Sequence, residues 1–282
     1  MPDLNPHVAV SQATEFFHTR DFQPGVAGRD GHLRLLSYNI QIGITSTRYR
    51  HYVTRSWRHV LPHLGSFDSL NQIAGLVGHF DIVALQEVDA GSFRSFFINQ
   101  VEFLARRGNF PHWYYQTNRN LGKFAQHSNG LLSRIDPYKV IEHKLPGVIP
   151  GRGVMEVQYG NPDNLLVLLL VHLGLGKRAR LRQLDFVSEL ANQHRHVVVM
   201  GDFNCRIGSP EMNALLARTS LNEPADDMHT FPSWRPKRNI DHILVSDTIR
   251  TRDIQVVPFT ISDHLPIAVD IAIPEGITLK TE

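Results

Sequence analysis

Short runs of apolar residues recur along the chain from about residue 33 onward. Several runs are nearly continuous in Val, Leu and Ile, a pattern typical of strands that are covered on both faces of a sheet. We therefore predict strands at residues 33–40, 81–87, 128–133, 153–159, 165–172, 196–202, 240–246 and 267–273.

Helical patterns separate these strands. In residues 70–79, apolar side chains recur at helical spacing from Leu70 to Val77. Farther along, Ser209 precedes Pro210, an order that suits an N-cap followed by the first position of a helix. Helices are predicted at residues 11–19, 70–79, 95–106, 178–193 and 211–217.

The order of these elements bounds the fold. Strands and helices mix without a strict strand–helix–strand rhythm, which favours an α/β or α+β sandwich. No repeat, linker or low-complexity segment divides the sequence. We therefore expect an N-terminal leader at residues 1–31 and a single domain at residues 32–282.

Composition is that of an ordinary soluble globular protein, since 42% of the 282 residues are hydrophobic and 20% are charged. The formal net charge of +2 neither requires nor excludes a polyanionic partner. Cys205 is the sole cysteine, which excludes an internal disulfide and a cysteine-based zinc cluster. The N-terminus lacks a secretory pattern, and the longest apolar run, residues 165–171, is too short to span a membrane. We expect a cytoplasmic protein without a transmembrane segment or an obligate protein partner.

Polar residues stand at or next to the ends of the predicted strands. One polar strand end means little, but a succession of them is how a preorganised site is built on rigid elements. The residues at these positions are Asn39, Gln86, Glu87, His172, Asp202, Asn204, Asp241, Asp263 and His264.

With these residues in place, the chain resembles the exonuclease–endonuclease–phosphatase superfamily, which includes deoxyribonuclease I, abasic-site endonucleases, neutral sphingomyelinases and inositol polyphosphate phosphatases. The resemblance implies a four-layer α/β/β/α sandwich of two mixed sheets flanked by helices, with the site at one edge of the sheets. The ordered motifs that carry it lie at residues 36–40, 84–87, 129–134, 171–173, 200–204, 240–246 and 262–266.

The resemblance also assigns catalytic roles. It implies that Asp202 positions or deprotonates the attacking water and that Asn204 donates to a phosphate oxygen. His264 would contact the phosphate, paired with Asp241, which would fix its tautomer. His172 matches the phosphate-contacting histidine of the deoxyribonuclease and sphingomyelinase branches.

A metal is expected beside these groups. Glu87 offers a hard carboxylate oxygen, and with amide and carboxylate oxygens nearby, Mg²⁺ or Mn²⁺ fits better than zinc. Asn39 can supply an amide oxygen to the metal or an amide donor to phosphate. By resemblance, Asp263 is a second acidic ligand of metal or water.

Other residues keep two interpretations. Arg152, flanked by glycines, either binds phosphate or is an exposed turn residue; Asn129 either lines the site or caps the turn into Gly130. His242 follows Asp241 and points to the opposite face of its strand, so we assign it to packing.

Two basic, aromatic segments stand out as well. Residues 47–63 form either a substrate-gripping surface or a helix packed by its aromatic face. Residues 231–238, just before Asp241, can form the other side of a positively charged rim. Gln41 stands where abasic endonucleases carry an acid, which weakens the assignment of this chain to that branch.

Together these features predict a metal-dependent phosphodiesterase that hydrolyses nucleic acid or a phosphodiester headgroup by in-line attack of an activated water. The alternatives are a phosphomonoesterase acting on inositol or sugar phosphates and a non-catalytic binding module. The set Glu87, Asp202, Asn204, Asp241 and His264 argues against the last, because a binder does not need all five.

Overall fold

The computed structural model describes residues 31–41, 65–120, 126–147, 151–225 and 228–281. The predicted helix at residues 11–19, the segment 47–63 and residues 1–30 of the expected leader lie outside these ranges. Among the described residues, no helix is long and apolar enough to cross a membrane.

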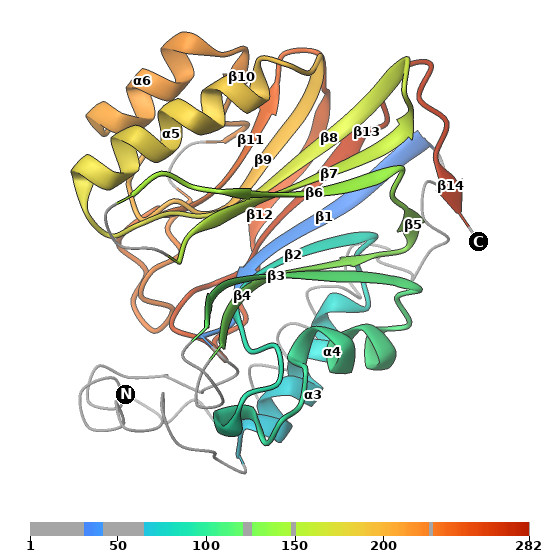
Figure 1. Cartoon of the computed structure of the whole chain (residues 1–282), viewed down its shortest axis with the longest axis vertical. Coiled ribbons are helices and arrows are strands. Elements are labelled where there is room, and N and C mark those ends of the chain that lie inside the picture. The colour runs from blue at the N-terminus through green and yellow to red at the C-terminus, as the bar shows by residue number, and fades with distance from the viewer. Residues whose placement is uncertain (1–30, 42–64, 121–125, 148–150, 226–227, 282) are drawn as a thin grey trace.

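Two six-stranded sheets form the centre of the molecule (Figure 1). The first has the order β12 (Thr251–Val256), β13 (Ile267–Ala272), β1 (His32–Asn39), β2 (Ile82–Val88), β4 (Gln126–Ser133) and β3 (His112–Asn120). The second has the order β10 (Leu221–Asn222), β11 (Asp241–Ser246), β9 (His196–Asp202), β8 (Asn164–His172), β7 (Gly153–Asn161) and β6 (Lys139–Lys144). Short strands β5 (Ile135–Asp136) and β14 (Lys280–Thr281) pair separately.

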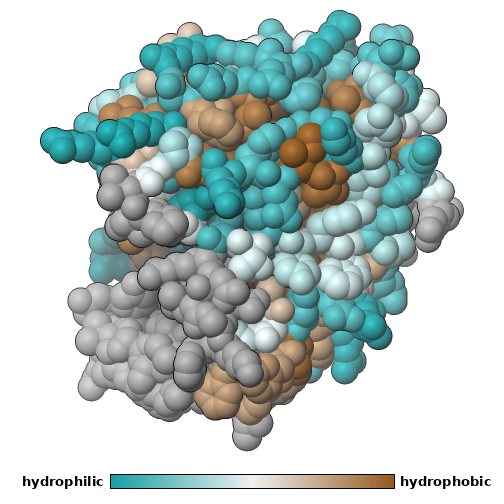
Figure 2. Space-filling view, viewed as in Figure 1, coloured by the Kyte–Doolittle hydropathy of each residue, from teal (hydrophilic) through white to brown (hydrophobic). Residues whose placement is uncertain are grey.

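Helices cover the outer face of each sheet. The first sheet carries α3 (Gly65–Val77) and α4 (Gln100–Gly108), and the second carries α5 (Lys177–Ala191) and α6 (Pro210–Arg218). Figure 2 shows mainly hydrophilic side chains on the outer surface around α5 and α6, with smaller hydrophobic patches between them. The predicted α/β/β/α sandwich is therefore confirmed.

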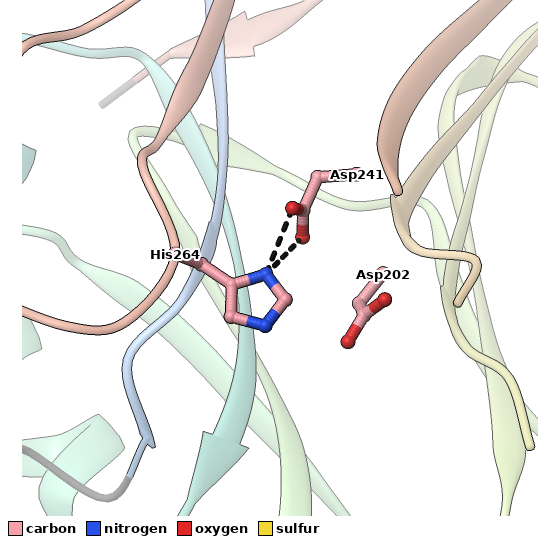
Figure 3. Close-up of side chains that lie close together, drawn as sticks. All are labelled: Asp202, Asp241 and His264. Carbon is pink, nitrogen blue, oxygen red and sulfur yellow. Dashed lines mark hydrogen bonds and ion pairs between the residues drawn. The ribbon is translucent and has the colours of Figure 1, made fainter. Parts of the chain in front are cut away.

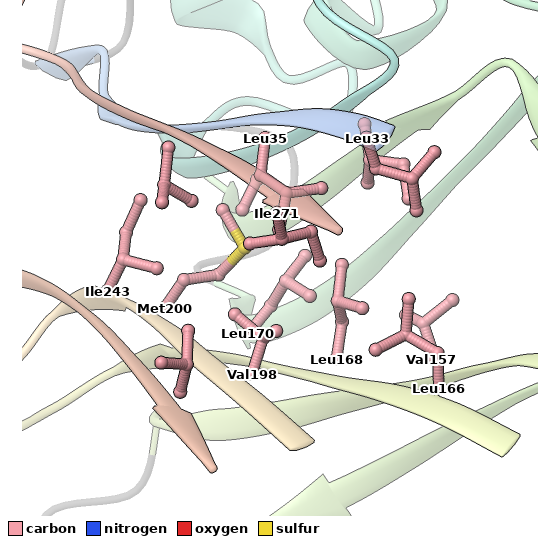
Figure 4. Packing of buried hydrophobic residues seen from close by; sticks show 14 of the residues in the cluster. Leu33, Leu35, Val157, Leu166, Leu168, Leu170, Val198, Met200, Ile243 and Ile271 are labelled. Atoms are coloured by element: carbon pink, nitrogen blue, oxygen red, sulfur yellow. The ribbon is translucent and has the colours of Figure 1, made fainter. Parts of the chain in front are cut away.

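The largest apolar layer lies between the two sheets. Leu33 and Leu35 of β1 face Leu168 and Leu170 of β8 there (Figure 4). Because side chains alternate along a strand, Leu36, the residue after Leu35 in β1, packs instead against the layer of α3 and α4. Both faces of the central strands are buried, as their continuous apolar sequences predicted.

All the predicted strands of the described residues are present, and strands β3, β6, β10 and β12 of the large sheets and the separate β5–β14 pair are additional. The four additional strands of the large sheets lie at sheet edges, where polar residues are tolerated. In β6 the sequence is Lys-Val-Ile-Glu-His-Lys, and none of its residues is fully buried. Such strands lack the apolar run on which the prediction relied.

The helix predicted at residues 95–106 begins later, and the prediction was wrong at that end. Helix α4 starts at Gln100, where the Asn99 side chain accepts from the amides of residues 101 and 102 as an N-cap. Before it, Phe93–Ser95 forms a 3-10 turn (η4), followed by Phe96 and Phe97 with positive φ. The cap at Ser209 is confirmed, since its hydroxyl accepts from Met212 N and Pro210 opens α6.

Candidate functional site

Strand pairing brings the predicted polar residues to one edge of the sandwich. Parallel β1 and β2 end side by side, with Asn39 opposite Gln86. Parallel β8 and β9 also end together, so that His172 lies opposite Asp202. Antiparallel β11 begins at the same edge, with Asp241 opposite Asp202. Residues far apart in sequence therefore share one site, because four of these strands end at this edge and β11 begins there.

Asp202, Asp241 and His264 form the buried centre of the site (Figure 3). His264 Nδ1 lies 2.8 Å and 3.0 Å from the two carboxylate oxygens of Asp241. This contact assigns the Nδ1 hydrogen to the Asp241 side and turns the other ring nitrogen toward Asp202 (Figure 3). Thr230 also donates its hydroxyl to Asp241 Oδ2. The carboxylate of Asp241 thus has partners on both sides, and the imidazole is held in one orientation.

The pKa values in this centre are shifted by burial and by neighbouring charge. Burial lowers the pKa of His264, but the attraction of Asp241 outweighs it and raises that pKa to about 10. Burial and the repulsion of Asp241 raise the pKa of Asp202 to about 7. Burial, with the charge of Glu87 adding to it, raises the pKa of Asp263 to about 6. Several carboxylates therefore crowd one small volume, where the His264 imidazolium offsets part of their negative charge.

Asn39 connects the two sheets at this edge. Its side-chain Nδ2 donates to Asp202 Oδ2 at 3.2 Å, and its Oδ1 accepts from the amide of Gln41 at 3.1 Å. The contact between Asn39 and Asp202 spans 163 residues of sequence. It fixes the carboxylate of Asp202 from the first sheet, while Asp202 itself belongs to the second.

A tight turn follows Asp202. Asp202 Oδ1 accepts from the amide of Asn204 at 2.9 Å, and Asn204 has a left-handed φ of 53°. The Asn204 side chain donates to the carbonyl of Leu173 at 3.0 Å. Before the turn, a Cβ on Gly201 would lie 1.9 Å from the Val171 carbonyl oxygen, and the φ of Gly201 is +146°. Only glycine fits there.

His172 lies between the candidate acids and an arginine. Its Nε2 is 3.5 Å from Asp202 Oδ2 and 3.8 Å from Glu87 Oε1. On the other side of the ring, Arg152 Nη1 is 2.6 Å from Nδ1. Since a guanidinium can only donate, Nδ1 accepts and the ring hydrogen sits on Nε2, facing the acids. Arg152 is half-buried and contacts a site histidine directly, and phosphate binding by its guanidinium stays a prediction.

Glu87 is the most accessible of the predicted acids, with 30% of its side chain exposed. It lies at an irregularity in the β2–β4 pairing and has a φ of 55°, which turns its side chain away from the regular strand direction. Asp263 is buried, and its Oδ1 accepts from the Ser262 hydroxyl at 3.3 Å. The amide of His264 donates to the same hydroxyl, which closes the turn.

Asn129 lies at a junction between the two sheets, where its side chain reaches strand β7. Its Nδ2 donates to the carbonyl of Gly153 at 3.3 Å, and only 1% of the residue is exposed. A Cβ on Gly153 would lie 2.5 Å from Gln116 Oε1, so that strand β7 approaches the first sheet closely. Asn129 therefore supports the backbone next to Arg152.

The donor set fits a divalent cation. Within the described residues, Asp202, Asp241 and His264 offer ligand atoms within 4.8 Å of one another. Asp241 and His264 are already hydrogen-bonded to each other, whereas the Glu87 carboxylate is partly exposed to solvent. Burial and, after it, the repulsion of neighbouring carboxylates raise the pKa of Asp202 and Asp263, and a bound dication would relieve that repulsion.

Sequence reasoning missed several supporting residues. Thr230 binds Asp241, and the Tyr38 hydroxyl accepts from the amide of Ser262 at 3.2 Å, across 224 residues of sequence. The Phe231 ring lies 4.8 Å from the His264 ring, and the Arg238 guanidinium lies over Phe231 at 4.5 Å. The predicted rim at residues 231–238 does adjoin the site, but no pattern in the sequence singled out these individual contacts.

Comparisons with known proteins agree with this fold. A model of the Endonuclease/Exonuclease/phosphatase family matches residues 36–264. A solved endonuclease/exonuclease/phosphatase from Beutenbergia cavernae DSM 12333 superposes with a TM-score of 0.67 at 18% identity, covering 86% of this chain and 72% of that one. The search of curated proteins found no matching sequence.

Two further solved structures share the fold. A mannosyl-6-phosphatase from Bacteroides thetaiotaomicron VPI-5482 gives a TM-score of 0.63 at 18% identity, covering 85% of this chain and 99% of that one. ANGEL2, a 2',3'-cyclic phosphatase solved with adenosine-2',3'-vanadate, gives a TM-score of 0.61 at 14% identity, covering 85% and 95%. At these identities the likeness concerns the fold.

Proposed function

Since the chain belongs to the endonuclease/exonuclease/phosphatase family, we propose that it is a divalent-metal-dependent phosphodiesterase. Members of this family are phosphoester hydrolases, so the proposal concerns the metal, the substrate class and the residues. The observation that supports it best is the buried Asp202–Asp241–His264 centre beside the open carboxylate of Glu87.

In the proposed reaction, Asp202 orients the attacking water and takes its proton. The raised pKa of Asp202, about 7, suits a group that accepts a proton near neutral pH. Asn39 holds the carboxylate of Asp202 in place by its 3.2 Å hydrogen bond. The water then attacks phosphorus in line with the leaving oxygen.

His264 stabilises the negative charge on the phosphoryl oxygens. Its raised pKa, about 10, keeps the ring protonated at neutral pH, and Asp241 fixes the orientation. His172 adds a second donor, because Arg152 at Nδ1 leaves the hydrogen on Nε2. The Asn204 side chain, which donates one Nδ2 hydrogen to the Leu173 carbonyl, donates its other Nδ2 hydrogen to another phosphate oxygen.

Glu87, Asn39 and Asp263 would hold Mg²⁺ or Mn²⁺. When bound there, the metal would supply charge neutralisation at the phosphate and at the leaving oxygen. Hard oxygen donors favour these ions over zinc. The substrate is a phosphodiester of nucleic acid or of a phospholipid headgroup.

A second candidate is a phosphomonoesterase acting on a sugar or inositol phosphate. The likeness to a mannosyl-6-phosphatase over 85% of this chain favours testing it. The same residues would serve either reaction, because a monoester differs in the charge on the phosphoryl group and not in the in-line attack.

The test is a turnover panel with the purified chain in Mg²⁺, Mn²⁺ or EDTA. The substrates are plasmid and abasic DNA, single-stranded RNA, sphingomyelin, inositol phosphates, mannose 6-phosphate and a bis-aryl phosphodiester. We expect metal-dependent turnover of at least one diester, and a loss of about a hundredfold or more in His264→Ala. Turnover of monoesters alone would favour the second candidate. No metal-dependent turnover of any substrate would contradict both.

A further inference from the structure

His242 lies next to Asp241 on β11, but its side chain points to the opposite side of the second sheet. The residue is fully buried. Its Nδ1 lies 2.6 Å from Glu223 Oε1, and its Nε2 lies 2.8 Å from the carbonyl oxygen of Cys205. Both partner atoms are acceptors, so both ring nitrogens donate. The Glu223 carboxylate balances the charge of a ring that carries two hydrogens.

His242 contacts both sequence neighbours of Asn204. The ring of Phe203, the residue before Asn204, lies 5.2 Å from the imidazole between centroids, with an angle of 84° between the planes. Cys205, the residue after Asn204, supplies the carbonyl that accepts from Nε2. His242 therefore contacts the residues directly before and directly after Asn204.

Asn204 needs such support because its backbone is strained. Its φ of 53° lies in the left-handed region, which residues other than glycine rarely occupy. Conformations of this kind persist where the surroundings fix them from several directions. The Asp202 carboxylate fixes the turn from the site, through the Asn204 amide at 2.9 Å. The amide of Phe203 binds the carbonyl of Ile240 at 2.8 Å, and the imidazole fixes the turn from behind.

We infer that His242, held by Glu223, is a positioning residue that keeps Asn204 in the conformation needed at the site. Two adjacent residues of β11 then serve the site from opposite sides: Asp241 orients His264, and His242 orients the turn after Asp202. The effect on rate rests on the proposed function, whereas the effect on the conformation of Asn204 does not. A packing role, as assigned to His242 from the sequence, does not account for its two hydrogen bonds and its contact with the Phe203 ring.

The first test measures kcat and KM for His242→Gln and Glu223→Ala. Glutamine cannot reach both partners, and alanine at 223 leaves the ring free to turn. We expect kcat to fall by about ten- to a hundredfold, since small misplacements of a reacting group cost this much. The matched control is His196→Gln, at the far end of β9, where another buried histidine binds the Thr248 hydroxyl. Its kcat should be unchanged.

A double-mutant cycle separates positioning from general loss of stability. In an Asn204→Ala background, His242→Gln should lower kcat no further, because the group it positions is gone. A full additional loss in that background would overturn the inference. If His242→Gln fails to fold, the same cycle is run with Glu223→Ala.

The second readout needs no activity. In a crystal structure of Glu223→Ala or His242→Gln, Asn204 should leave the left-handed region or lose its hydrogen bond to Asp202. An unchanged Asn204 in either variant would overturn the inference. If the wild-type chain hydrolyses none of the substrates, the proposed function fails and this structural result still decides the role of His242.

Discussion

The two sides of the candidate site are built differently. Around Asp202 and His264, every acid or imidazole is buried and bonded to another residue of the site. Around Glu87, the carboxylate is partly exposed, and its nearest ionic contact is His172 at 3.8 Å. The first side is ordered by the protein alone, and the second retains coordination capacity. In the proposed function, an ion completes the Glu87 side.

The largest expected effect lies on the buried side. Asp202→Asn keeps the shape of the side chain but removes the group that accepts a proton. We expect kcat to fall by about a hundred- to ten-thousandfold, with no recovery at high metal concentration. Steady-state kinetics with a bis-aryl phosphodiester measure it. Asp247→Asn, an exposed aspartate after the far end of β11, is the control and should retain full activity. Recovery of Asp202→Asn by excess metal would remove the distinction between the two sides.

A smaller effect with a different form is expected on the open side. Glu87→Gln weakens a ligand, so the apparent metal affinity should fall by about ten- to a hundredfold and the rate should return as metal is added. Metal titrations of activity, or calorimetry with Mn²⁺, measure this. Glu142→Gln on the exposed edge strand β6 is the matched control. If the loss in Glu87→Gln is independent of metal concentration, Glu87 is not a metal ligand.

The pH dependence of stability should also distinguish the sides. The pKa of His264 is raised from 6.5 to about 10, so the folded chain holds this proton where the unfolded chain has lost it. The free energy of unfolding should therefore be highest below pH 6.5 and fall as the pH rises toward 10. Urea denaturation in EDTA measures the slope. We expect a smaller slope in His264→Gln and the wild-type slope in Glu87→Gln; equal slopes in all three proteins would refute this account of His264.

The smallest effect serves as a calibration. Ser209→Ala removes the N-cap of α6 and no group that we assign to the reaction, and should lower the free energy of unfolding by about 1 kcal/mol. Its kcat should equal that of the wild type. A drop in kcat here would mean that modest destabilisation alone reduces activity, and the larger losses would then need correction.

The sequence predicted the fold best where burial requires a continuous or periodic run of apolar residues. Strands buried on both faces, such as β8 and β9, were predicted within a residue or two because no polar residue interrupts them. Edge strand β6 was not predicted because its only two apolar residues, Val140 and Ile141, stand between charged residues. The start of α4 was wrong because Asn99 caps the helix after a loop whose sequence also fits a helical period.

For the site, strand ends indicated which residues gather, but not which of them touch. The contact between Asn39 and Asp202 depends on how two sheets pack, which no local pattern encodes. His242 was assigned to packing because its neighbour on β11 faces the site and it does not. Its partners, Glu223 and the Cys205 carbonyl, become visible only when strands β9, β10 and β11 lie in one sheet.

The requirement for glycine at position 201 has a consequence for how the sequence can evolve. Since the Val171 carbonyl occupies the place of its missing side chain, glycine is demanded by the joining of β8 to β9. We expect lineages that abandon hydrolysis to keep this glycine while His264 drifts, and randomised libraries selected only for folding to recover it. We therefore expect glycine at position 201 wherever the fold persists, and the neighbouring acids only where hydrolysis persists.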